Sequence, residues 1–100
     1  MAYGDPVKVA SNVYKLVMEN NRVRVFSVKF KPGDKAAMHD HPDHVVYVVN
    51  GSKIKMTSPG KKAAEMELKA GQAIFLEAQP HEVVNIGKTN LDLIVVELKE

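Results

Sequence analysis

The sequence predicts an all-β protein, a sandwich or a barrel built from short antiparallel strands. Turn-forming residues recur roughly every eight to twelve positions, and short apolar or alternating runs lie between them. No segment shows a convincing helical period of apolar residues. Many short strands at such a spacing are typical of sandwiches and barrels.

The expected strands follow the turn signals along the chain. The run 13–18 is ambiguous, because Val13, Leu16 and Val17 also fit one face of a helix. Its shortness and its strand-rich surroundings favour a strand. The predicted strands are 7–10, 13–18, 23–30, 36–41, 45–49, 53–57, 64–68, 73–76, 81–86 and 91–98.

Two of the connections carry specific expectations. Asn50-Gly51 predicts a two-residue hairpin of type I′, because both central residues of that turn need positive φ. The segment 77–80 is expected to form a tight loop between two strands. The strands on either side of Gly51 should therefore pair with each other.

Length and composition limit the classes of function. A chain of 100 residues predicts a single domain over 1–100, with N-terminal strands at about 1–30 and the main barrel at about 31–98. An evenly spread net charge of +2 gives no reason to expect a nucleic-acid partner. The lack of cysteine excludes thiolate metal sites and disulfides. Without a signal-peptide pattern or a membrane-length apolar run, we expect a cytoplasmic protein with no membrane partner.

All four histidines fall in two segments, each shortly after a glycine turn. His39 and His41 are two residues apart, so on a strand both project from one face and could hold a metal ion together. His44 follows a turn at Pro42-Asp43 and joins them if that turn keeps its strand in the inward phase. His81 lies on a later strand. A solvated histidine pair and a structural His81 are the alternative interpretations.

The two histidine segments resemble the cupin family. The first cupin motif, glycine, His-x-His and a second glycine, matches Gly33, His39, His41 and Gly51. The second motif matches Gly71, His81 and Asn85. Three features depart from the family pattern: His44 stands where the family has glutamate, the gap from His41 is one residue short, and residues 77–79 replace Pro-x-Gly, so His81 arrives one residue early.

This resemblance implies an antiparallel jelly-roll barrel with a metal centre. The implied ligands are His39, His41, His81 and, in place of glutamate, His44, for one divalent transition metal among Fe, Mn, Ni, Zn and Cu. The implied function is that of a metal-dependent oxygenase or isomerase acting on a small organic acid or carbonyl compound held in the barrel. A non-enzymatic metal- or ligand-binding module and a barrel with a vestigial site are the alternatives.

Several polar residues near the motifs are weighed for other roles. Asp40 should face away from its histidine neighbours into solvent. Arg22 and Arg24 could clamp a carboxylate, although a solvated strand face is the preferred interpretation. Glu77 could act as a general base, against the alternative of a solvated loop carboxylate.

Two runs are apolar on both strand faces, 45–49 and much of 91–96. A barrel wall that faces water should instead alternate between apolar and polar residues. The outer face must therefore be covered, either by the N-terminal strands or by a second subunit, and we expect a homodimer.

Overall fold

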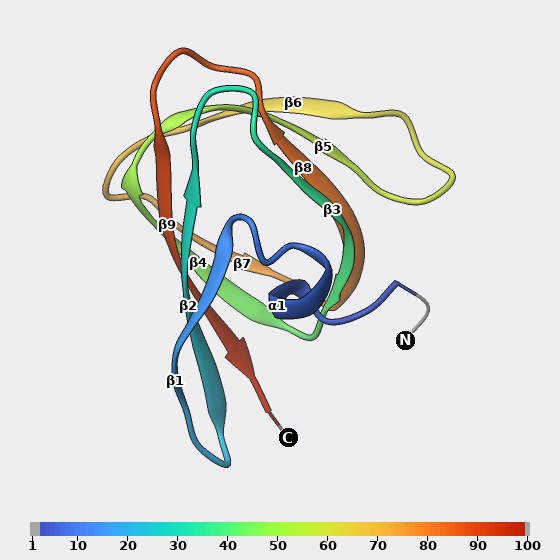
Figure 1. Ribbon diagram of the computed structural model, residues 1–100, viewed down its shortest axis with the longest axis vertical. Coiled ribbons are helices and arrows are strands. Elements are labelled where there is room, and N and C mark those ends of the chain that lie inside the picture. The colour runs from blue at the N-terminus through green and yellow to red at the C-terminus, as the bar shows by residue number, and fades with distance from the viewer. Residues whose placement is uncertain (1–2, 100) are drawn as a thin grey trace.

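The computed structural model describes residues 3–99, which form two antiparallel sheets and one short helix (Figure 1). The helix α1 covers Pro6–Val9. The strands are β1 (Tyr14–Glu19), β2 (Val23–Phe30), β3 (Lys35–His41), β4 (His44–Asn50), β5 (Ser52–Thr57), β6 (Ala64–Leu68), β7 (Ala73–Leu76), β8 (Gln79–Asn85) and β9 (Leu91–Leu98).

The two sheets face each other as a jelly roll. One sheet has the strand order β1-β2-β9-β4-β7 and the other has the order β3-β8-β5-β6. The β1–β2 and β5–β6 hairpins each stay within one sheet. Every other connection between consecutive strands carries the chain from one sheet to the other. The predicted antiparallel jelly-roll fold is thus confirmed, although no strand pair among residues 3–99 joins the two sheets into a closed barrel.

The prediction of a hairpin at Asn50-Gly51 is wrong. Strand β4 pairs with β7 and β9, whereas β5 pairs with β6 and β8, so the chain changes sheets at Gly51. Within residues 3–99 the positive-φ residues are four other glycines, and a type I′ turn is therefore excluded here. Gly51 serves a different need, because a Cβ at this position would stand 2.1 Å from the carbonyl oxygen of Leu68.

Two expected boundaries also differ. The segment expected as an edge strand at 7–10 is the helix α1, because Asp5 caps it by accepting from the Val7 amide and Pro6 stands in its first turn. The loop expected at 77–80 is shorter, since β8 already begins at Gln79, which pairs with His41. The ambiguous run 13–18 is a strand, as predicted, and β1 pairs with β2.

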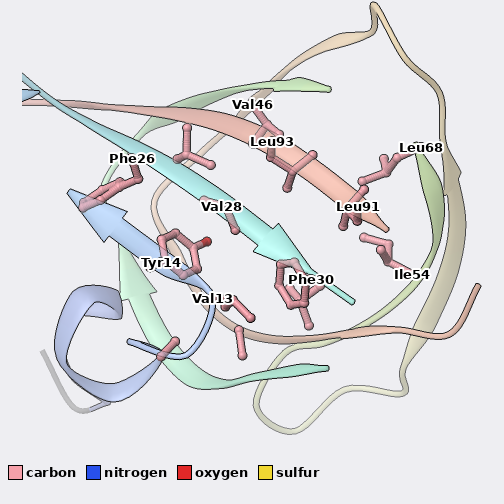
Figure 2. Close-up of a cluster of buried hydrophobic side chains, with 14 of the residues drawn as sticks. Val13, Tyr14, Phe26, Val28, Phe30, Val46, Ile54, Leu68, Leu91 and Leu93 are labelled. Atoms are coloured by element: carbon pink, nitrogen blue, oxygen red, sulfur yellow. The ribbon is translucent and has the colours of Figure 1, made fainter. Parts of the chain in front are cut away.

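The core fills the space between the sheets. Phe26, Val28 and Phe30 alternate inward along β2, and Leu91 and Leu93 do so along the adjacent β9 (Figure 2). Tyr14 reaches the same interior from β1, with its ring edge against Phe26. Burial of this kind contributes roughly 1.5–3 kcal/mol for each large apolar side chain. The core therefore holds the two sheets together.

The outer face of the five-stranded sheet is apolar across its width. A cross-strand row joins Phe75, Val45, Val96, Val25 and Met18, one residue from each strand. Phe75 is 55% exposed and Met18 is 44% exposed. Among the described residues, no helix is long and apolar enough to cross a membrane.

Candidate metal centre

The first three candidate ligands lie on neighbouring strands. His39 and His81 are register partners in the β3–β8 pair, and His41 is two residues further along β3. One extra residue in β3 between Ala36 and His39 shifts the register. Beyond this bulge both β3 histidines face the interior and are buried. The two histidine segments, which are about forty residues apart in the chain, thus lie on paired strands.

The imidazole rings form one compact cluster. Ligand atoms of His39, His41 and His81 all lie within 4.8 Å of one another. The ring of His44 stacks on that of His41, with 4.3 Å between centroids, and lies 6.1 Å from that of His81. His44 is 1% exposed, so the Pro42 turn does keep its strand in the inward phase. Its service as a fourth ligand stays a prediction.

Hydrogen bonds fix the same tautomer in every ring. The Nδ1–H of His39 donates to the Ala37 carbonyl at 2.6 Å, and that of His44 donates to the Pro42 carbonyl at 2.7 Å. His81 Nδ1 is 3.3 Å from Oε1 of Gln79. His41 Nδ1 donates to Glu97 Oε2 at 2.6 Å. Because each Nδ1 faces an acceptor, each Nε2 keeps the lone pair that a metal needs.

The cluster holds its imidazoles neutral. Burial, followed by the nearby rings of His44 and His39, lowers the pKa of His41 to about 2. Burial and the other imidazoles likewise lower the pKa of His81 to about 2. Burial also lowers the pKa values of His39 and His44. Neutral imidazole is the form that binds metal, so little proton competition is expected near neutral pH.

Among residues 3–99, one fully buried side-chain atom has no hydrogen-bond partner, and it belongs to this cluster. Nε2 of His39 is buried and makes no hydrogen bond, whereas its Nδ1 is satisfied. A buried polar atom without a partner is costly and calls for an explanation such as a bound ion. A divalent metal that prefers nitrogen ligands would satisfy this atom, and the residues present therefore fit such an ion.

The sequence analysis missed Glu97, which binds the Nδ1 side of the His41 ring. Glu97 is 2% exposed on β9, and its carboxylate accepts from both His41 and Arg24. Arg24 also binds the Asp5 carboxylate, with Nη1 2.8 Å from Oδ2. Burial raises the pKa of Glu97, while the hydrogen bond from Arg24 opposes that shift. The preferred interpretation of Arg24 as a solvated residue is wrong, since it clamps two carboxylates of its own chain.

Tyr14 contacts the opposite, Nε2 side of the His41 ring. The Tyr14 hydroxyl is 3.0 Å from Nε2 of His41. Since Nδ1–H donates to Glu97, Nε2 is the acceptor and Tyr14 the donor. Burial and the charge of Glu97 raise the pKa of Tyr14, so the hydroxyl keeps its proton. The sequence analysis predicted no role for Tyr14.

The cluster borders an apolar cavity of about 80 Å³ between the sheets. Tyr14, His44 and His81 line one part of it, and the rest of the lining is apolar. Met56 and Met66 are among these apolar lining residues. The cavity thus places an apolar space beside the imidazoles, an arrangement common in small-molecule sites.

The remaining candidates take structural positions. Asp40 does not face solvent, because it is 8% exposed and its Oδ2 accepts from the Tyr3 and Gly4 amides. Its carboxylate therefore fixes the N-terminal segment against β3. Glu77 is exposed in the loop after β7 and does not line the cavity, in agreement with the solvated alternative. Asn85 is buried and accepts from the Ser52 hydroxyl.

Comparison with known proteins identifies the family. A family model described as a cupin domain matches residues 26–97. The chain therefore belongs to the cupin family, as its histidine motifs indicated. No functionally curated protein matches it in sequence.

Solved structures agree on the fold. A cupin domain from Bordetella pertussis is similar with 24% identity and a TM-score of 0.81, over 88% of this chain and 93% of that one. A Klebsiella pneumoniae protein with a double-stranded β-helix domain has 23% identity and a TM-score of 0.67, over 88% and 84% of the two chains. The polyketide cyclase RemF from Streptomyces resistomycificus has 22% identity and a TM-score of 0.66, over 87% and 64%. At these identities the likeness shows the fold alone.

Proposed function

We propose that this cupin binds one divalent transition metal and that the loaded form acts on a small organic acid or carbonyl compound as an oxygenase or isomerase. His39, His41 and His81 would hold the ion, with His44 as the fourth ligand. The observation that carries the proposal is the buried, unpartnered Nε2 of His39 beside two further imidazoles whose Nδ1 atoms face acceptors.

The donor set suits several metals. Neutral imidazoles bind Fe, Mn, Ni, Zn and Cu in their divalent states, and ligand type alone does not choose among them. An ion held by neutral ligands keeps its full charge and supplies Lewis-acid stabilisation to an enolate or carboxylate. The protein contributes the orientation of the imidazoles, the apolar surroundings and a protonated hydroxyl at Tyr14. Exclusion of water by the apolar lining would strengthen each electrostatic interaction there.

Metal analysis of the protein purified without chelators and without nickel affinity resin tests the metal site. The four histidines are then replaced singly by Ala, and bound metal is measured for each folded variant. We expect loss of metal from the His39, His41 and His81 variants. Loss from His44→Ala as well would support four ligands, whereas full occupancy there would support three.

Full occupancy in all four variants would refute the proposed site. The exposed residue Glu77 provides a control, because Glu77→Ala alters a side chain outside the cavity and should leave metal content unchanged. The catalytic part of the proposal is tested separately. The Fe, Mn, Ni, Zn and Cu forms are assayed with enolisable acids and diketones, with and without oxygen.

A non-enzymatic binding module is the second candidate function. It is favoured by the engagement of Glu97, the buried carboxylate nearest the cluster, with both Arg24 and His41. A carboxylate held by two donors is poorly placed to move protons to or from a substrate. Tight metal or ligand binding without turnover in every metal form would support this function.

A further inference from the structure

We propose that the cavity takes a small ligand with a single oxygen-bearing anionic head, a carboxylate or an enolate, on a wholly apolar body, and that Tyr14 donates a hydrogen bond to that head. This inference rests on the proposed metal site and narrows the class of substrate for it. It follows from the distribution of polar groups around the cavity and from the present partner of the Tyr14 hydroxyl.

The polar groups of the cavity lie on the histidine side. Tyr14, His44 and His81 supply them, and the rings of Tyr14 and His81 each lie close to that of His39, at centroid distances of 5.3 Å and 4.8 Å. The other lining side chains are aliphatic, aromatic or thioether groups. A charged or strongly polar group on the far part of a ligand would therefore be buried without a partner.

The cost of such burial decides the class of ligand. Moving an ionised carboxylate into apolar surroundings without a partner costs far more than the gain from burying a few methylene groups. The cavity volume of about 80 Å³ sets the size. Since about 15 Å³ of such volume holds one water molecule, there is room for an apolar body of roughly five water-sized groups, with the head beside the imidazoles. A short-chain acid or enolate meets both limits.

The Tyr14 hydroxyl gives a second reason to expect an oxygen-bearing head on the ligand. It now donates to Nε2 of His41, the lone pair that a metal ligated by His41 would take. With that acceptor engaged, the buried O–H would have no partner beside the cavity it lines. Buried hydroxyls are costly without an acceptor. An oxygen atom of the ligand head provides one, so Tyr14 is a positioning residue that selects an acceptor-bearing head.

The apolar body has a defined direction. Met66 on β6 and Ile74 and Leu76 on β7 line the cavity and are half-buried. Strands β6 and β7 are each one edge of their sheet, and the opposite edges are β3, which carries His39 and His41, and β1, which carries Tyr14. The body of the ligand would therefore extend from the histidines toward β6 and β7, where Met66 lies at the margin of the core and is only partly buried.

The experiment compares two acids of equal length on the zinc-loaded protein, pentanoate and pentanedioate, by isothermal titration calorimetry. We expect pentanoate to bind at least tenfold more tightly. Tyr14→Phe should weaken pentanoate binding about tenfold, since a hydrogen bond to a charged group is lost, while zinc is retained. Met66→Lys should reduce the preference for pentanoate over pentanedioate, because the introduced ammonium group gives the second carboxylate a partner. Met18→Lys, on the outer face, is the matched control and should keep the wild-type preference.

Zinc content is measured on the same samples, which separates the two proposals. Bound zinc with equal affinities for the two acids, or with no binding of either acid, overturns the ligand inference and leaves the metal site standing. Unchanged pentanoate affinity in folded, zinc-loaded Tyr14→Phe overturns the role of Tyr14. Absence of bound zinc overturns the metal site and the ligand inference together.

Discussion

Replacement of Glu97 by glutamine tests whether the carboxylate behind His41 supports metal binding. Glu97 Oε2 accepts from His41 Nδ1 at 2.6 Å, and the pair is almost completely buried. Glutamine keeps the shape of the side chain but removes its charge. A hydrogen bond to a charged group contributes about 1.5–3 kcal/mol and a neutral one about 0.5–1.5 kcal/mol. The difference of about 1–1.5 kcal/mol corresponds to roughly a tenfold weaker affinity.

The assay is competition for zinc against a chromophoric chelator, with wild-type and Glu97→Gln proteins at the same pH. Outer carboxylates of this kind typically change metal affinity about 10- to 100-fold, and the estimate lies at the lower end. Glu82→Gln is the matched control, because Glu82 stands beside His81 in the chain but pairs with Lys35 at the surface. It should bind zinc as the wild type does.

A folded Glu97→Gln protein with wild-type zinc affinity would refute the reasoning. Folding is checked by thermal unfolding of the metal-free proteins. Arg24 loses one of its two charged partners in this variant but keeps Asp5, so we expect the variant to fold. An equal loss of affinity in Glu97→Gln and Glu82→Gln would point to a general charge effect instead of the specific contact to His41.

Three further predictions concern acidity, packing and assembly. The pKa values of His41 and His81 are about 2 in the folded state against about 6.5 in the unfolded state, so the unfolded chain binds more protons below pH 6.5. Stability of the metal-free protein should therefore fall with pH from there, by about 1.4 kcal/mol per histidine at pH 5.5; urea unfolding measures it, and a pH-independent midpoint would contradict it. Gly51→Ala should destabilise the fold by about 1–3 kcal/mol, because its Cβ would meet the Leu68 carbonyl; an unchanged melting temperature would contradict this. Light scattering should report a homodimer that Phe75→Lys weakens, and a monomeric wild type at micromolar concentration would exclude it.

The sequence by itself determined which side chains within a regular stretch of strand share a face. Side chains alternate with a period of two, so His39 and His41 had to share a face with each other wherever their strand lay. The same period puts His44 with Val46 and Val48, and all three are buried. These features depend on local backbone geometry, which a short stretch of residues specifies.

Local signals failed where the chain changes sheets. Asn50-Gly51 carries the strongest hairpin signal of the chain, yet β4 and β5 belong to different sheets. The requirement for glycine comes instead from the close approach of the Leu68 carbonyl. Which strands pair depends on the packing of both sheets around one core, and no short segment contains that information.

The surroundings of the candidate metal site were decided by tertiary structure alone. Glu97 is 56 residues from His41 in the chain, and their hydrogen bond joins β9 of one sheet to β3 of the other. In the sequence it looks like an ordinary charged residue near the end of an apolar strand. Burial beside Arg24 and His41 gives it a role, since a carboxylate can be buried only where charged and hydrogen-bonding partners surround it.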